Sequence, residues 1–306
     1  MYYFIVNEHG GSGKAKKTWS KVKTLMKEKG IEYKAWESKY EGHATKLAKH
    51  ITELEDDDIR LIVLGGDGTM NEVLNGMSHF DKVRVGLIPT GSGNDLARGL
   101  DIPRDTKLAL EKILHSQEDC TIDLGIVTRE DGESRIFAIS SGIGMDAIVC
   151  HKASLSKLKK ILNKVKLGKF TYILMTIYTI FSMDNVKTTV QFDNQEPIDF
   201  NKMIFIASMN VRAEGGGVPM APGARFDDGL LSVCVAHGIP RWRAFLALPR
   251  LVAAKHLKIK GFSVTDCKEV DIITEKPMTL HADGEYGGEV SHIRLKCLEN
   301  KLRMML

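Results

Sequence analysis

The sequence predicts an α/β N-terminal domain built on a parallel sheet, followed by a mainly β, sandwich-like C-terminal domain. Strand and helix patterns alternate along the first third of the 306 residues, which is typical of a parallel sheet with helices on both faces. After about Asp119 the pattern changes to short strands separated by turn residues. Glycine-rich segments follow several of the early strands, where α/β proteins bind their ligands.

The first domain is expected to span residues 1–120. Its strands are short apolar runs such as Ile59–Leu64, which has the composition of a buried strand. The expected elements are, in chain order, strand Tyr2–Val6, helix Thr18–Lys29, strand Tyr33–Trp36, helix Ala44–Leu54, strand Ile59–Leu64, helix Met70–Gly76, strand Val83–Ile88 and a helix start at Asp95–Gly99.

The second domain is expected to span residues 121–292 and to be rich in strands. Two helical stretches interrupt it, Ser154–Met183 and Arg241–Lys258, and Pro249 is expected to kink the latter. The expected strands are Asp123–Val127, Ser134–Ser140, Thr188–Phe192, Met203–Ala207, Leu230–Ala236, Val270–Thr274 and Met278–Ala282.

The composition is that of an ordinary globular protein, with 43% hydrophobic and 27% charged residues. A net charge of +4 is too small to indicate nucleic acid, and we expect no such partner. Five widely spaced cysteines without metal-site spacing indicate reduced thiols and a cytoplasmic protein. The start, Met1–Val6, has the pattern of a strand rather than of a signal peptide, and Phe170–Met183 is too short to span a bilayer.

The segment Gly65–Thr69 stands between the strand Ile59–Leu64 and the helix that begins near Met70. This arrangement binds phosphate, because backbone N–H groups and the helix dipole point to one spot that glycines leave open. Asp67 adds an acid, which indicates magnesium or phosphoryl chemistry because a bare carboxylate repels phosphate. Taken alone, the segment is equally consistent with a plain tight turn.

A second glycine-rich segment, Asn7–Lys14, follows the first strand. It is not a Walker A loop, because Glu8 stands where the first glycine belongs and Ala15 follows the lysine. It is not a dinucleotide fingerprint either, because Lys16 replaces the third glycine.

A third segment, Pro89–Arg98, follows another apolar strand. In it Asn94 is a candidate cap for a helix starting near Asp95, and Ser92 offers a hydroxyl to a phosphate or ribose. Three such loops at successive strand ends of a parallel sheet lie side by side, which predicts a nucleotide-phosphate site.

Acidic residues recur beyond these loops. Asp123 lies near the junction of the two domains, and Asp283 and Glu285 end an apolar strand, where extended backbone would put both on one face. Such an acid could serve as a general base, although Asp283-Gly284 alone is also a good hairpin turn. The run Arg225–Leu231 is either another hairpin turn or a site for a hard cation.

Together these residues resemble the diacylglycerol kinase catalytic family of lipid kinases, in particular its soluble bacterial branch. The resemblance covers nearly the whole chain. Its motifs are, in order, Gly65–Thr69 with Asn71-Glu72, Pro89–Arg98, Ile122-Asp123, Gly142 with Gly144, Pro219–Pro222, Asp227–Leu231 and Asp283–Glu285.

The resemblance implies an ATP-dependent kinase that phosphorylates a lipid hydroxyl, with diacylglycerol or a related lipid alcohol as the substrate. It implies a phosphofructokinase-like first domain, an active site between the domains, and a C-terminal tail of about residues 293–306 that returns to the first domain. By motif position, the residues implied to contact ATP are Asn7, Gly11, Ser12, Gly13, Ser38, Gly66, Asp67, Gly68, Thr69, Asn71, Glu72, Ser92 and Asn94.

Two positions depart from the family pattern. Ser38 stands where the family usually has threonine, which keeps the hydroxyl, and the loop from Asn7 to Gly13 carries an extra residue.

The resemblance also implies two kinds of magnesium site. A structural Mg²⁺ would be held by the Asp228 side chain and by the carbonyl groups of Arg225 and Leu230. Glu285 matches the general base of the bacterial family, and Asp67 matches the acid proposed as base or metal organiser in eukaryotic relatives. The acids implied to organise catalytic Mg²⁺ are Asp67, Asp95, Asp123 and Asp283.

The stretch Ala147–Met183 contains seven lysines and no acidic residue. Apolar residues recur in it at helical spacing beneath a basic rim, which is typical of an interfacial helix on anionic lipid. We therefore expect a lipid substrate at an anionic membrane surface and a peripheral location at the inner membrane face. A helix packed on the β domain with a solvated basic face is the alternative, and the oligomeric state stays open, a homodimer included.

Three other functions compete with this one. An NAD kinase shares the Gly65–Thr69 turn, but Pro89–Arg98 is similar to the lipid-kinase loop. The same loop and the basic apolar stretch disfavour a soluble-sugar kinase. A non-catalytic lipid-binding protein should have lost the acids that this chain keeps.

Overall fold

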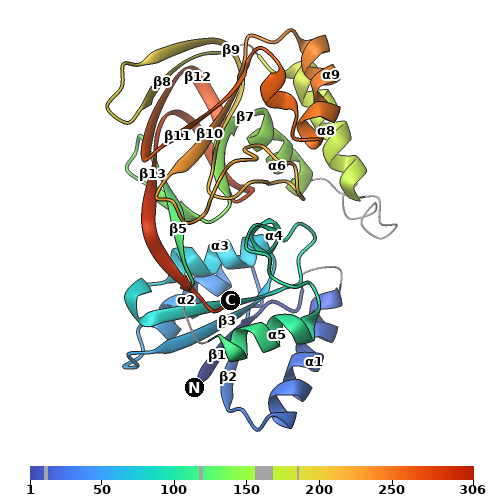
Figure 1. Cartoon of the computed structure of the whole chain (residues 1–306), viewed down its shortest axis with the longest axis vertical. Helices are drawn as coiled ribbons and strands as arrows, with labels where there is room; N and C mark the ends of the chain where they lie inside the picture. Colours follow the sequence, from blue (N-terminus) through green and yellow to red (C-terminus); the bar gives the residue numbers. More distant parts are fainter. Residues whose placement is uncertain (10–12, 117–119, 156–167, 185) are drawn as a thin grey trace. The chain divides into compact units, whose positions relative to one another are not determined.

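The computed structural model describes residues 1–9, 13–116, 120–155, 168–184 and 186–306. The chain forms two compact units, which Figure 1 shows in sequence colours. The first unit comprises Met1–Asp123 and Glu299–Leu306, and the second comprises Leu124–Leu298. The expected junction was at 120–121, and the expected returning tail began at about residue 293, whereas the returning segment of the first unit begins at Glu299.

The first unit is built on a parallel sheet. Its strands β1 (Tyr2–Val6), β2 (Tyr33–Glu37), β3 (Ile59–Gly65) and β4 (Val83–Pro89) are ordered β4-β3-β1-β2. The last residues of β13 (Glu285–Met304) pair in parallel with β4 and extend the sheet at that side. Because the pairs are parallel, the carboxyl ends of β1 to β4 all meet at one edge.

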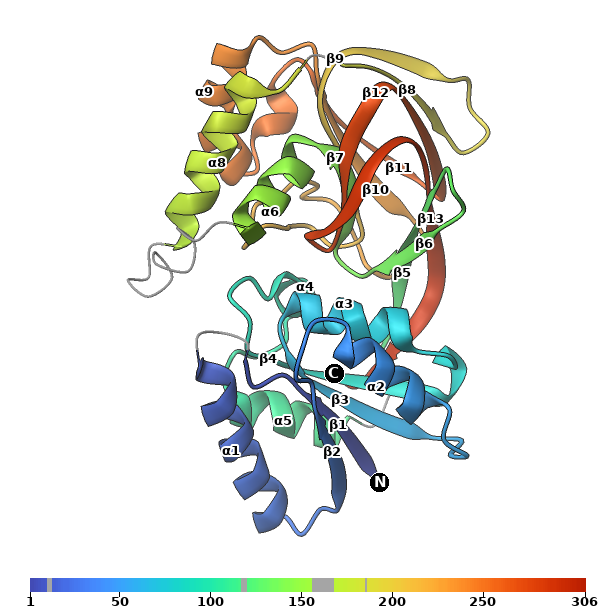
Figure 2. The same cartoon turned by 180° about the vertical axis from the view of Figure 1, so that it is seen from behind.

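Helices cover both faces of this sheet (Figures 1 and 2). On one face, α1 (Lys14–Glu28) and α5 (Thr106–His115) bury apolar side chains against β1, β3 and β4. On the other, α2 (His43–Thr52) packs against α3 (Asp67–Gly76). The short helices η2 (Phe80–Lys82) and α4 (Asp95–Gly99) flank β4 in the chain. The core between the sheet and helices α1 and α5 includes Phe4, Val6, Trp19, Val22, Met26, Ile62, Leu64, Ile88, Leu110 and Ile113.

The second unit is mainly antiparallel. Its strands follow the order β11-β10-β9-β7-β12-β13, with β5 beside β13, β6 beside β5, and β8 beside β12 and β9. The strands are β5 (Cys120–Arg129), β6 (Ser134–Phe137), β7 (Ser140–Gly144), β8 (Val186–Phe192), β9 (Ile198–Met209), β10 (Leu231–His237), β11 (Phe262–Cys267), β12 (Glu269–Ala282) and β13.

Helices α6 (Met145–Leu155), α8 (Gly168–Ser182) and α9 (Arg241–Val252) pack on one side of these strands. Strand β10 shows how the alternation of side chains supplies two cores. Val233 and Val235 join the core between the strands, whereas Cys234 and Ala236 join the core beneath the helices. Burial raises the pKa of the Cys234 thiol to about 12, so this side chain is an inert apolar group.

The expectation of one helical stretch over Ser154–Met183 was wrong at its start, because α6 begins at Met145. Residues 156–167 lie outside the described residues, and with them the expected apolar stripe at Leu158, Leu162 and Val165. The lysines in that range, Lys157, Lys159, Lys160, Lys164 and Lys166, also lie outside them.

Other element ends also differ from the expectation. Helix α9 includes Pro249 but ends at Val252, because Ala254 takes a left-handed conformation and the separate turn η3 (His256–Lys258) follows. The two strands expected at 270–274 and 278–282 are the single strand β12, whose pairing with β13 shifts register between Ile273 and Met278. Helix α5 and strand β11 were not expected.

A glycine at the end of α3 sets how closely α3 approaches α2. A Cβ at Gly76 would overlap the carbonyl oxygen of Thr45. Gly76→Ala should therefore lower the free energy of unfolding by about 1–3 kcal/mol through overpacking, despite the better helix propensity of alanine.

Urea denaturation of Gly76→Ala beside Gly223→Ala checks this prediction, because a Cβ at Gly223 would meet no atom within 4 Å. Equal stability of both variants would show that the α2–α3 contact adjusts freely.

Candidate phosphate-binding site and acidic turn

The glycine-rich loops of the first unit do meet at the carboxyl edge of its sheet. The backbone N–H of Asn7 donates to Leu64 O at 2.9 Å, and that of Ser38 donates to Val6 O at 2.8 Å. The N–H of Thr90 donates to Gly65 O at 2.8 Å. The segments that follow β1, β2, β3 and β4 are thus joined in one row.

The second and third loops touch backbone to backbone. A Cβ at Gly66 would lie 2.9 Å from the Cα of Gly91, and a Cβ at Gly91 would lie 2.7 Å from the Cα of Gly66. Side chains at either position would separate the loops, so both glycines are required for the close approach. Helix α3 begins at Asp67, directly after Gly66, with its first N–H groups at this edge.

Asp67 joins the second loop to the third. Its Oδ2 accepts the N–H of Asp95 at 3.1 Å, and its Oδ1 accepts the N–H of Leu96 at 3.3 Å. The sequence assigned the capping of α4 to Asn94, and this was wrong: the Asn94 side chain donates to Gly91 O instead. Asn94 has φ of 52°, which turns its side chain back into the loop.

Two carboxylates converge beside Gly93. A Cβ at Gly93 would lie 3.0 Å from Asp67 Oδ2 and 3.3 Å from Asp95 Oδ2. Asp95 is buried and forms an ion pair with Arg98, whose guanidinium also donates to Gly93 O. Gly93 was not singled out from the sequence, because only the fold shows that its missing side chain leaves this space.

Several other residues implied to contact ATP make contacts within the first unit. The Asn7 amide donates to Thr69 Oγ1 at 2.9 Å, and Glu72 accepts the N–H of Ala44 at the start of α2 at 3.0 Å. Asn71 and Ser38 are buried, whereas Ser92 is exposed.

The first loop is described only in part. Gly13 has φ of 88° and precedes α1, whereas Gly11 and Ser12 lie outside the described residues.

Asp123 lies at the end of the first unit and is fully buried. Its Oδ1 accepts the N–H of Asn300 at 2.7 Å, and the Thr121 hydroxyl donates to the Asn300 side chain at 3.0 Å. Asp123 thereby holds the returning end of β13. Of the predicted acid network, Asp67, Asp95 and Asp123 belong to the first unit, and Asp283 belongs to the second with Glu285.

Asp283 and Gly284 form the two-residue turn between β12 and β13, since Ala282 pairs with Glu285. Their φ values of 51° and 81° are those that the tight turns of hairpins require. The Asp283 carboxylate accepts the N–H groups of Ala138, Ile139 and Ser140 at 2.8–3.1 Å. The turn therefore fixes the backbone position of Glu285, the first residue of β13.

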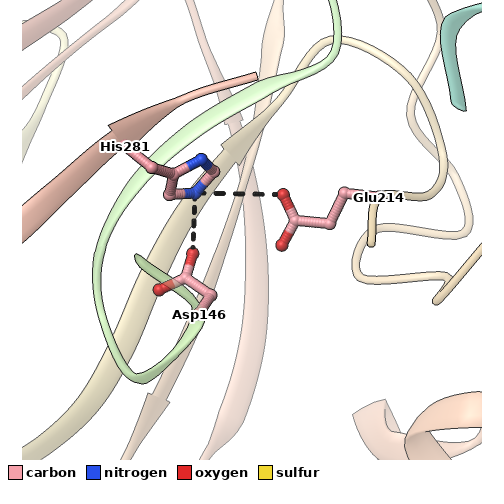
Figure 3. A group of neighbouring side chains, drawn as sticks. All are labelled: Asp146, Glu214 and His281. Carbon is pink, nitrogen blue, oxygen red and sulfur yellow. Dashed lines mark hydrogen bonds and ion pairs between the residues drawn. The ribbon is translucent and has the colours of Figure 1, made fainter. Parts of the chain in front are cut away.

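His281 stands two residues before this turn, between two acids (Figure 3). Its Nε2 lies 3.0 Å from Asp146 Oδ2 and 4.0 Å from Glu214 Oε2, and all three side chains are at most 12% exposed. Burial acts to lower the pKa of His281, but the carboxylates of Asp146 and Glu214 outweigh it and raise that pKa.

Sequence reasoning did not find this group. The pairing joins residues that are 135 positions apart.

The predicted structural metal site falls on an exposed turn before β10. Asp228 Oδ1 accepts the N–H of Leu230 at 3.1 Å, and Arg225 pairs with Asp227 at 3.1 Å. Arg225, Asp228 and Leu230 are thus within one turn, which is compatible with the prediction but does not test it.

Two family models match the chain. The model described as the diacylglycerol kinase catalytic domain matches residues 1–127. The model described as the YegS C-terminal NAD kinase beta sandwich-like domain matches residues 139–306.

Curated relatives match over the same length. The chain is 29% identical to the diacylglycerol kinase of Staphylococcus carnosus (strain TM300), over 94% of this chain and 89% of the relative. It is 27% identical to a Bacillus subtilis (strain 168) protein named "Putative lipid kinase YtlR", over 99% of this chain and 98% of that protein.

A solved structure from Bacillus anthracis (strain Sterne), described as a "putative diacylglycerol kinase", shares the fold. Its TM-score is 0.76 at 22% identity, with 99% of this chain and 96% of that chain covered.

The two units therefore define a two-domain kinase, with touching glycine-rich loops at the carboxyl edge of the first unit and a β-sandwich-like second unit. The chain belongs to the diacylglycerol kinase catalytic-domain family of lipid kinases, as the resemblance predicted. Membership supports a phosphotransferase, and a kinase implies the use of ATP. Among the helices in the described parts of the chain, none is long and apolar enough to cross a bilayer.

The capping contact of Asp67 makes a prediction about stability. Asp67→Ala removes the acceptor of two N–H groups at the start of α4 and should lower the free energy of unfolding by about 1 kcal/mol. Asp67→Asn keeps one oxygen and should lose less. Urea denaturation of the three proteins checks this order, and an Ala variant more stable than the wild type would show that repulsion from Asp95 outweighs the cap.

Proposed function

We propose that the chain is an ATP-dependent lipid kinase that phosphorylates the hydroxyl group of diacylglycerol or of a related lipid alcohol. The observation that carries the proposal is the carboxyl edge of the first unit, where N–H groups, touching glycines and paired acids lie together. Positioning and charge neutralisation are most of what phosphoryl transfer needs. The family membership supports lipid as the substrate class.

The residues at this edge fit a nucleotide and a cation. The close approach of Gly66 and Gly91 leaves backbone N–H groups at the start of α3 accessible to phosphate. The carboxylates of Asp67 and Asp95 converge beside Gly93, and such oxygens are the ligands that Mg²⁺ prefers. When bound, ATP supplies the phosphoryl group and Mg²⁺ offsets its charge.

Glu285 is the proposed general base. The hairpin turn before it is held by three N–H bonds to Asp283, which fix the backbone from which Glu285 extends. A base must stand in a fixed place to take the proton of a substrate hydroxyl. The second magnesium site, with Asp228 and the carbonyl groups of Arg225 and Leu230, is proposed to stabilise the turn before β10.

Transfer of labelled phosphate from ATP into a lipid extract tests the function. Glu285→Gln keeps the size of the side chain but cannot accept the proton, so the rate of transfer should fall at least about hundredfold. Glu299→Gln, an exposed acid on the same strand, is the matched control and should leave the rate unchanged.

The second family model names an NAD kinase sandwich, so NAD is the competing acceptor. Labelling of NAD and not of lipid would replace the proposal with that one. Near-normal lipid labelling by Glu285→Gln would remove Glu285 as the base.

We also propose that helices α8 and α9 dock the enzyme on an anionic membrane. The two helices contact each other, and Arg241 of α9 donates to the carbonyl groups of Phe181, in the last turn of α8, and of Met183, directly after it. Neither helix contains an acidic residue. Five large exposed side chains define the α8–α9 surface: Tyr178, Phe181, Trp242, Phe245 and Leu246.

The charge of α9 favours an anionic membrane, rather than another protein, as the partner of this surface. Arg241, Arg243 and Arg250 are exposed on α9 beside these apolar side chains. An apolar surface rimmed by arginine complements lipid chains beneath anionic headgroups. A kinase that acts on a lipid hydroxyl needs contact of this kind to reach its substrate.

Vesicle sedimentation tests the membrane contact. Trp242 is 57% exposed, and Trp242→Ala should weaken binding to phosphatidylglycerol-containing vesicles about tenfold, because it removes a large apolar side chain that membrane binding would bury. Ile273→Ala, at an apolar position on β12 that is 50% exposed, should bind as the wild type does. Equal binding of the wild type to neutral and anionic vesicles at low salt would contradict the proposal.

A further inference from the structure

A histidine, His281, contacts Gly284, the second residue of the turn before Glu285. The backbone N–H of Gly284 donates to His281 Nδ1 at 3.2 Å. His281 is also held through its own backbone, because the Ser141 hydroxyl donates to His281 O at 2.7 Å. The imidazole therefore lies between the turn on one side and Asp146 on the other.

The hydrogen bonds fix which nitrogen of the ring carries the proton. The carboxylates of Asp146 and Glu214 raise the pKa of His281, but a second ring proton on Nδ1 would point at the Gly284 N–H. In this hydrogen-bonded arrangement the ring is therefore neutral, with one donor and one acceptor nitrogen. Nδ1 receives the Gly284 N–H, so Nε2 carries the hydrogen and donates it to Asp146 Oδ2 at 3.0 Å. Glu214 completes the surroundings through a hydrogen bond with the Ser140 hydroxyl.

This assignment argues against a metal ion at the cluster, although three ligand atoms of Asp146, Glu214 and His281 lie within 4.8 Å of one another. A metal bound to Nε2 would leave the ring proton on Nδ1. Nδ1 cannot carry that proton, because its lone pair accepts the N–H of Gly284. The cluster fits a hydrogen-bonded chain from Asp146 through His281 to the Gly284 peptide.

We propose that His281 is a positioning residue for Glu285: Asp146 orients its ring, and its Nδ1 fixes the Gly284 peptide from which Glu285 extends. The inference rests on the proposed function, because it assumes that Glu285 is the base. Asp283 holds one residue of the turn and His281 holds the next, so the two contacts together leave the Glu285 backbone one orientation.

Two substitutions separate the two contacts of the ring. Asn at position 281 places an amide oxygen near the position of Nδ1, so His281→Asn keeps the acceptor for Gly284 and loses the bond to Asp146. Gln places an amide nitrogen near Nε2, so His281→Gln keeps the donor to Asp146 and loses the acceptor for Gly284.

The expected results run in opposite orders for stability and activity. His281→Gln should keep the higher melting temperature, yet its kcat should fall about tenfold with an unchanged KM for ATP, as small misplacements of a reacting group do. His281→Asn should melt lower, because Asp146 stays buried without its donor, but should keep the higher kcat. A purely structural histidine would give the same order in both measurements, and that result would overturn the proposal.

Ser141→Ala is the control for the case in which the Asn variant does not fold. It removes the bond to His281 O but leaves the ring contacts, so it should lose stability and keep its kcat. Loss of kcat in Ser141→Ala equal to that in His281→Gln would also overturn the proposal.

A second readout keeps the inference independent of the proposed function. If the wild type phosphorylates no lipid, the proposed function fails, and hydrogen exchange of the Gly284 amide still tests the contact. Exchange at Gly284 should be faster in His281→Gln than in His281→Asn, and the reverse order would overturn the role of Nδ1.

Discussion

The contact on which the first unit depends is the backbone approach of Gly66 to Gly91. It places the loop after β3 against the loop after β4 with no side chain between them. The bond from Thr90 N–H to Gly65 O and the bonds from Asp67 to α4 follow from that approach, because they span the same two loops. A parallel sheet brings strand ends to one edge, but only glycines allow their loops to touch.

The acids of this protein hold backbone as well as carrying charge. Asp67 accepts N–H groups of α4, Asp123 accepts that of Asn300, and Asp283 accepts three from the segment before β7. Removal of one of these acids should therefore lower the free energy of unfolding, because it leaves backbone N–H groups without their acceptor. This is why stability has to be measured beside activity in every variant of the site.

The sequence predicted the first unit well because its signals are local. An apolar run such as Ile59–Leu64, followed by glycines, identifies a strand and its loop without knowledge of the fold. Strand β11 and the long β13 were missed, since half-exposed strands have weak apolar patterns of their own. The capping of α4 by Asp67 was missed because Asp67 is 28 positions away from Asp95, whereas Asn94 directly precedes the helix and is a common capping residue.

The hydrogen bonds of His281 to Asp146 and Gly284 show what sequence motifs cannot predict about the turn before Glu285. The Asp283–Glu285 motif marks the turn and the acid, but the His281 ring that accepts a turn N–H is itself held by Asp146, 135 positions away in the sequence. A two-residue hairpin turn fixes the direction of its two strands. The orientation of Glu285 also depends on the plane of the Gly284 peptide, which needs contacts of its own. Asp283 supplies that constraint from one side through N–H bonds, and His281 supplies it from the other by accepting the Gly284 N–H. The backbone position of Glu285, the proposed base, therefore depends on a buried polar network that no single motif contains.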